Sequence, residues 1–385
     1  MMKINNRLSN VYEYHFKKIN DKKNEALLNG KKIIDLSIGD PDLTVHSKIT
    51  DALIEGLKDD RYNNYPPYDG LMELKKAVIR YYNQVYSVSL SLDEVIILIG
   101  SKEGISNIIP AVCDIGDCVI VPEPAYPVYS TCSKLWGCVP YTVALTQNNG
   151  YMMNLEVIPE EIVKKCKLIF INYPNNPTGA VASSEFYKRI IKFSYDNNIV
   201  LCNDSAYNEI IQVNKKNISL MQYDLKRKCV EFGTLSKTYN MTGYRIGYAV
   251  GNAKVINSLL KIKSNCDSGQ FIPIQKAAIA ALNLERDYIH NTRKIYDERR
   301  EVAKSVLLQK NVDFFDAEGT FYLWCKTPKN YTTNEYCEEL LENYGIVVTP
   351  GNVFGKLGYD YFRIALTKDK LIIEKALKSL KKCGY

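Results

Sequence analysis

The centre of this chain alternates short apolar, β-branched runs with longer amphipathic stretches, and this alternation limits the possible folds more than any other feature. The runs at 95–99, 118–121, 168–171, 199–202, 230–232 and 246–250 are typical of buried strands. Between them, stretches such as 184–197 gather Phe186, Ile190 and Phe193 on one helical face. Connections of this length are right-handed crossovers, so the pattern predicts an α/β fold: a three-layer sandwich with a mostly parallel central sheet.

The two ends of the chain have a different pattern. A long charged helix at about 287–309 is followed by expected strands at 319–325 and 361–365. A chain of 385 residues also exceeds the size at which one hydrophobic core usually stops growing. We therefore predict a large domain at 45–285 and a smaller α+β domain built from 1–44 and 286–385.

Composition excludes several classes of function. The net charge of +7 comes from 50 basic and 43 acidic residues, and no basic stretch is interleaved with aromatic residues, which argues against a nucleic-acid partner. The apolar runs are too short to span a membrane, and the N-terminus lacks a signal-peptide pattern. Eleven cysteines, an odd number, and three histidines that lie near no cysteine pair indicate reduced thiols and no metal site. We expect a cytoplasmic protein.

Polar clusters follow several of the expected strands. In open parallel sheets, ligands bind beyond the carboxyl ends of the strands. The cluster at 100–104 suits a phosphate at a helix start, although a simple helix cap is an equal alternative. The cluster at 173–179 also fits an ordinary turn, and Asp204 also fits a helix cap.

The segment 233–247 carries the strongest chemical signal. Lys237 comes shortly after an expected buried strand, hydroxyl residues flank it, and Arg245 follows eight residues later. A lysine in this context is not typical of a solvated surface, and we interpret it as a functional residue.

Several motifs in this order resemble the fold-type I enzymes that use pyridoxal 5'-phosphate (PLP), specifically the class I/II aminotransferases. They are DLSIGDPDL, YPPYDG, GSKEGI, PEPAYPVY, YPNNPTGA, NDSAYNEI, LSKTYNMTGYRIG and YFRIAL, and they cover nearly the whole chain. Within that family, LIGSKEGI, SKTYNMTG, VGNA, KSNCDSGQF and VVTPGNVFG are similar to the prokaryotic LL-diaminopimelate aminotransferases.

The resemblance implies roles for individual residues around PLP. Lys237 would bind the cofactor as a Schiff base and then move the proton between the substrate Cα and the cofactor. Asp204 would keep the pyridine nitrogen protonated. Tyr126 would stack on the ring, and Tyr207 and Asn176 would bind its phenolate oxygen. The phosphate contacts implied in the same way are Ser101, Lys102, Thr234, Ser236, Arg245 and, from a neighbouring subunit, Tyr65.

On the substrate side, the resemblance implies that Arg363 binds the α-carboxylate, with Asn176 and the backbone at Gly39 beside it. A contribution from Tyr65 across subunits implies a homodimer with shared active sites. Asn203 stands where the diaminopimelate group usually has His, and Tyr244 where Trp is frequent.

The expected reaction moves an amino group from LL-diaminopimelate to 2-oxoglutarate, giving tetrahydrodipicolinate and glutamate in lysine biosynthesis. Three alternatives remain open. They are an aminotransferase of the same subgroup that uses aspartate, alanine or an aromatic amino acid, a PLP-dependent carbon–sulfur lyase, and a ligand-sensing regulator. The regulator would need a DNA-binding domain ahead of the first motif, and that motif begins by Asp35.

Overall fold

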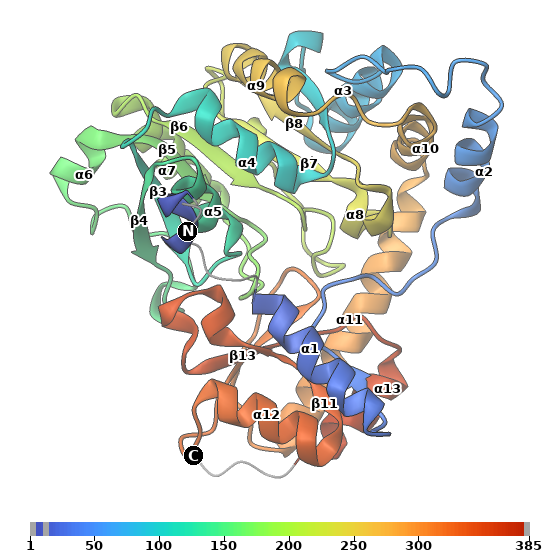
Figure 1. Cartoon of the computed structure of the whole chain (residues 1–385), viewed down its shortest axis with the longest axis vertical. Helices are drawn as coiled ribbons and strands as arrows, with labels where there is room; N and C mark the ends of the chain where they lie inside the picture. Colours follow the sequence, from blue (N-terminus) through green and yellow to red (C-terminus); the bar gives the residue numbers. More distant parts are fainter. Residues whose placement is uncertain (1–4, 11–14, 381–385) are drawn as a thin grey trace.

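The computed structural model, which describes residues 5–10 and 15–380, is built around a seven-stranded sheet (Figure 1). The strand order is β2-β8-β7-β6-β5-β3-β4, and only β8 runs antiparallel to its neighbours. The strands are β2 (Val95–Leu98), β3 (Cys118–Glu123), β4 (Val139–Ala144), β5 (Cys166–Ile171), β6 (Val200–Asp204), β7 (Val230–Thr234) and β8 (Gly247–Gly251).

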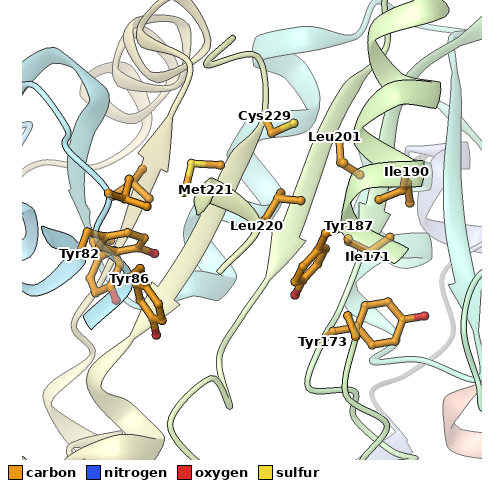
Figure 2. Close-up of a cluster of buried hydrophobic side chains, with 14 of the residues drawn as sticks. Tyr82, Tyr86, Ile171, Tyr173, Tyr187, Ile190, Leu201, Leu220, Met221 and Cys229 are labelled. Carbon is orange, nitrogen blue, oxygen red and sulfur yellow. The ribbon is translucent and has the colours of Figure 1, made fainter. Parts of the chain in front are cut away.

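Helices cover both faces of this sheet. Successive strand residues point to opposite sides, and both sides carry apolar side chains that must be buried. In β2, Val95 and Ile97 belong to one buried cluster, whereas Ile96 and Leu98 belong to another. The first cluster, part of which is shown in Figure 2, packs under α3 (Met72–Tyr86), α7 (Ser184–Asp196) and α10 (Ile272–Leu282). The second packs under α4 (Ser101–Val112), α5 (Val128–Leu135) and α9 (Ala253–Cys266).

A second, antiparallel sheet lies towards the C-terminus, with the order β12-β13-β10-β9. Its strands are β9 (Phe314–Phe315), β10 (Tyr322–Lys326), β12 (Thr349–Pro350) and β13 (Tyr361–Ala365). A core of its own joins it to α11 (Arg286–Gln309), α12 (Thr333–Tyr344) and α13 (Lys370–Lys378). The long helix α11 extends from the larger sheet region to the smaller one (Figure 1), with Ile289 in the first core and Tyr296 in the second.

The N-terminal segment crosses to this second region. Strand β1 (Ile34–Asp35) pairs in parallel with β11 (Ile346–Val347), and α1 (His15–Leu28) packs beside α12. The remaining helices are α2 (Ser47–Gly56), α6 (Glu160–Lys165) and α8 (Leu235–Thr238). Short 3-10 turns lie at Asn6–Asn10, Leu92–Glu94, Gln147–Asn149, Leu220–Gln222, Thr242–Tyr244, Gly351–Phe354 and Lys356–Gly358.

The predicted fold class is confirmed: an α/β sandwich with a mostly parallel central sheet and a smaller α+β part. The strand expected at 319–325 was wrong at its start, because Thr320 has φ +62° and β10 begins at Tyr322. The division at 45–285 stays a prediction. No helix within the described ranges 5–10 and 15–380 is long and apolar enough to cross a membrane.

Candidate active site

A cavity of about 390 Å³ lies at the carboxyl ends of β5, β6 and β7. The parallel arrangement brings Asn172, Asp204 and Thr234 to this one edge, and loops and strands of the second region close the other side. The cavity collects every predicted site residue except Tyr65, whose side chain is 87% exposed in the single chain. Those residues are Gly39, Ser101, Lys102, Tyr126, Asn176, Asp204, Tyr207, Thr234, Ser236, Lys237, Arg245 and Arg363.

Asp204, the last residue of β6, is a buried carboxyl group at the cavity wall. Burial raises the pKa of Asp204 to about 6, although the Tyr129 hydroxyl donates to its Oδ2 atom at 2.7 Å and the Ala206 N–H donates to Oδ1 at 3.3 Å. The carboxylate is therefore ionised at neutral pH, at a cost in desolvation that a bound cation would reduce.

Lys237 lies in the first turn after β7, on the short helix α8. Burial lowers the pKa of Lys237 to about 8, and its Nζ atom donates to the Gly39 carbonyl at 2.7 Å. A substantial fraction of this amine is neutral near pH 8, which is the form that reacts as a nucleophile or accepts a proton.

Two glycines keep open a cup at the start of α4. A Cβ atom on Gly100, which has φ +76°, would lie 2.6 Å from Nη2 of Arg245, and one on Gly247 would lie 2.9 Å from the Ser101 backbone nitrogen. The cup therefore presents N–H groups at the N-terminus of a 12-residue helix and a guanidinium group to the same space. This combination binds phosphate groups.

Arg363, in the middle of β13, is buried and reaches the cavity from the second region. Its Nη1 donates to Asn176 Oδ1 and its Nη2 to the Ser37 carbonyl, both at 2.7 Å. The guanidinium carbon lies 3.9 Å from the centroid of the Tyr322 ring and 4.8 Å from that of Phe354. These contacts fix the plane of the guanidinium, which has the geometry to bind a carboxylate through two hydrogen bonds.

Sequence reasoning missed several residues of this site, among them Tyr129, Asn172 and Tyr322. Tyr129 hydrogen-bonds Asp204, the Asn172 side chain donates to the Asp204 carbonyl at 2.7 Å, and Tyr322 lies under Arg363. Asn172 directly follows β5, so its position at a strand end was an available signal. Tyr322 offered none, because it is one aromatic residue among many in an apolar strand.

Asn203, the departure next to Asp204, points to the opposite side of β6. Its side chain donates to Glu231 at 3.1 Å and accepts from the Tyr173 backbone at 3.2 Å. Glu231 is buried and further hydrogen-bonded by Tyr82 and Ser219. Asn203 therefore belongs to a polar network inside the core and does not line the cavity.

The described donor set fits PLP group by group. The glycine-lined cup suits its phosphate, the buried carboxylate of Asp204 suits a protonated ring nitrogen, and the depressed pKa of Lys237 suits a reactive amine. Fold and site together define a PLP-binding α/β enzyme.

Comparison with known proteins gives the family. The model of the family "Aminotransferase class I and II" matches residues 31–380. The LL-diaminopimelate aminotransferase of Aquifex aeolicus is 42% identical over 95% of both chains, and that of Natranaerobius thermophilus is 41% identical over 100% of both. The substrate-bound structure of BacF from Bacillus subtilis superimposes with a TM-score of 0.94 at 30% identity, covering 98% of this chain and 96% of that chain.

The chain therefore belongs to the class I and II aminotransferases, and it transfers amino groups between amino acids and 2-oxo acids with PLP as its cofactor.

Proposed function

We propose that this aminotransferase takes the amino group of LL-diaminopimelate and passes it to 2-oxoglutarate, yielding tetrahydrodipicolinate and glutamate. The observation that carries the proposal is the full-length identity of 41–42% to two proteins that are named for that activity. The cavity, with a carboxylate-binding arginine, a reactive lysine and space for an extended substrate, is consistent with it.

The cofactor roles implied by the family resemblance are compatible with the chemistry of the residues that line the cavity. Bound PLP supplies a conjugated, protonated ring that accepts the electron pair of a bond at the substrate Cα. Asp204 would face the ring nitrogen and favour its protonated form, while Tyr126 would pack on the ring face. Asn176 and Tyr207 would donate to the phenolate oxygen. The phosphate would be bound by Ser101, Lys102, Thr234, Ser236 and Arg245, which all line the cavity.

Lys237 is the residue that carries the cofactor and moves the proton. Because burial lowers its pKa to about 8, the amine could take a proton from the substrate Cα and deliver it to the cofactor carbon on the other side of the shared nitrogen. Its Nζ atom lies at the cavity wall, where it donates to the Gly39 carbonyl at 2.7 Å.

Arg363 orients the substrate. A bidentate bond to the α-carboxylate, supported by Asn176, limits rotation about the Cα and keeps the bond to be broken in one direction. The contacts with Tyr322 and Phe354 hold the guanidinium plane in place before the substrate binds. Binding therefore costs little side-chain entropy at Arg363.

A donor panel tests the substrate. The purified enzyme is assayed with 2-oxoglutarate as acceptor and LL-diaminopimelate, meso-diaminopimelate, aspartate, alanine or phenylalanine as donor, and glutamate is quantified. We expect the highest kcat/KM with LL-diaminopimelate. A higher value with aspartate, alanine or phenylalanine would assign the chain to another member of the family.

We also propose that the active form is a homodimer. Tyr65 lies on the segment that leads into α3, which also exposes Tyr62, Tyr68 and Met72, and the Tyr62 ring contacts the exposed ring of Phe271. Several exposed large apolar side chains on one segment are typical of an interface. In a twofold dimer the same patch meets itself, and Tyr65 can then reach the phosphate of the neighbouring site. Sedimentation beside activity measured over a range of dilutions tests this, and an active monomer contradicts it.

A further inference from the structure

An ion pair at the wall of the cavity takes no part in the chemistry at Lys237. Lys23, on α1, donates from Nζ to Asp35 Oδ2 at 3.1 Å, and both residues line the same cavity as Arg363. Their side chains are only 17% and 19% exposed, so the pair is mostly covered but still reachable from the cavity.

Asp35 is held rigidly in place. The backbone N–H and the hydroxyl of Ser37 both donate to its Oδ1 atom, at 2.9 and 2.6 Å. Burial alone would raise the pKa of Asp35, but these bonds and Lys23 together lower it, so the carboxylate stays ionised. The Ser37 carbonyl accepts from Arg363, and this short segment therefore connects the ion pair to the carboxylate clamp.

The cavity wall also carries apolar side chains next in sequence to these polar residues. Ile38 separates Ser37 from Gly39, and Ile19 lies one helical turn before Lys23; both line the cavity, and Ile38 is exposed although it is a large aliphatic residue. The wall thus combines a polar site at Arg363 and Lys237, apolar side chains, and a paired positive and negative charge.

This arrangement matches a molecule with an amino-acid head at each end and methylene groups between them. LL-diaminopimelate has that form, because its two ends each carry an ammonium and a carboxylate group and three methylenes separate them. An ammonium–carboxylate head is complementary to a lysine–aspartate pair, each charge meeting its opposite. A donor with a single far charge satisfies only half of the pair.

We propose that Lys23 and Asp35 bind the far, non-reacting end of the donor: Lys23 binds its carboxylate and Asp35 its ammonium group. The inference rests on the proposed function and adds the residues that select the donor. The same Lys23 would bind the far carboxylate of 2-oxoglutarate, which explains how one site accepts both reaction partners.

The competing explanation is that the Lys23–Asp35 ion pair has a structural role alone and stabilises the packing of α1 against β1. The chain provides a matched control in Lys22, the preceding residue on α1, which forms an ion pair with Glu338 and does not line this cavity. Each of the variants Lys22→Met and Lys23→Met removes one ion pair between α1 and the second region. Only Lys23→Met also changes the wall of the cavity.

The test uses the holoenzyme and three donors that differ only at the far end. L-Lysine is LL-diaminopimelate without the far carboxylate, and L-2-aminopimelate is the same molecule without the far amine. The donor half-reaction is followed by cofactor absorbance without any acceptor, so that binding of 2-oxoglutarate does not enter. Thermal melting of each variant is recorded beside the kinetics, and Lys23→Gln serves as a second variant should Lys23→Met not fold.

We expect Lys23→Met to lower kcat/KM for LL-diaminopimelate by roughly 30-fold or more, the lower end of the range for a desolvated charge partner, and to change kcat/KM for L-lysine by less than about threefold. Asp35→Asn should lower kcat/KM for LL-diaminopimelate more than kcat/KM for L-2-aminopimelate. Lys22→Met should leave kcat/KM unchanged for all three donors.

Equal losses with all three donors, or no loss, would overturn the inference while leaving the proposed function intact, provided that the wild-type enzyme uses LL-diaminopimelate. A wild-type enzyme that does not use LL-diaminopimelate overturns the proposed function, and the inference with it.

Discussion

The guanidinium carbon of Arg363 lies 3.9 Å from the centroid of the Tyr322 ring, whose hydroxyl oxygen is 2.9 Å from that of Tyr207. One side chain thus supports both the carboxylate clamp and a residue assigned to the cofactor ring. The three residues come from β13, β10 and the segment after β6, so this contact joins the smaller sheet to the larger one.

Tyr322→Leu removes the ring and should lower kcat/KM for every donor by roughly 10- to 30-fold, because a desolvated cation–π contact contributes about 1.5–2 kcal/mol. Tyr322→Phe keeps the stack and loses only the hydroxyl bond, so it should retain kcat/KM within about threefold while shifting the cofactor absorbance through Tyr207. Steady-state kinetics and absorbance spectra of both variants check this. Equal damage from Phe and Leu would show that the hydroxyl, and not the stack, matters.

Asp204 should destabilise the cofactor-free protein. Its pKa of about 6 lies above the ordinary value of 3.8, so the ionised form is disfavoured in the folded state by roughly 3 kcal/mol. This penalty is complete above pH 6 and disappears as the pH falls towards 3.8. Asp204→Asn should therefore raise the free energy of unfolding of the cofactor-free protein at pH 8, with a smaller gain at pH 5, while transamination is lost.

Urea unfolding of the cofactor-free forms at the two pH values measures the effect. If Asp204→Asn is less stable than the wild-type protein at both pH values, the ionised Asp204 carboxylate does not destabilise the folded protein, and the prediction is wrong.

Gly247 should be required for cofactor affinity. A Cβ atom there would lie 2.7 Å from the Gly233 carbonyl and 2.9 Å from the Ser101 nitrogen, both backbone atoms that cannot move aside easily. Gly247→Ala should displace the N–H groups of the cup and weaken PLP binding by at least about tenfold, as loss of a charge-assisted hydrogen bond does. Gly243→Ala is the control, because its Cβ would meet nothing within 4 Å. Fluorescence titration with PLP compares the two, and equal affinities contradict the description of the cup.

Much of the larger sheet could be predicted because its strands are buried on both faces. A continuous apolar run such as Leu168–Ile171 is readable without knowledge of its neighbours. Strand β4 was missed because it lies at the sheet edge, where Val139 and Ala144 are exposed and the pattern is mixed. The reversed direction of β8 was not readable, since direction depends on pairing and not on composition.

The same contrast holds for the site. Residues within motifs, such as Asp204 at the end of β6 and Lys237 in the first turn after β7, lie at strand ends, so their position at the sheet edge could be expected. Tyr322 and Lys23 reach the cavity only because β10 and α1 pack against it from far along the chain. Such contacts depend on tertiary packing, which local periodicity does not record.

The identity of the reactive lysine can be tested directly. The purified protein is reduced with borohydride in the presence of PLP, digested, and examined by peptide mass spectrometry. We predict one phosphopyridoxyl adduct, on Lys237, and Lys237→Ala should lose both the adduct and transamination while still binding PLP through the cup around Arg245. An adduct on a different lysine, or none at all, would contradict the assignment of this cavity as the site of amino-group transfer.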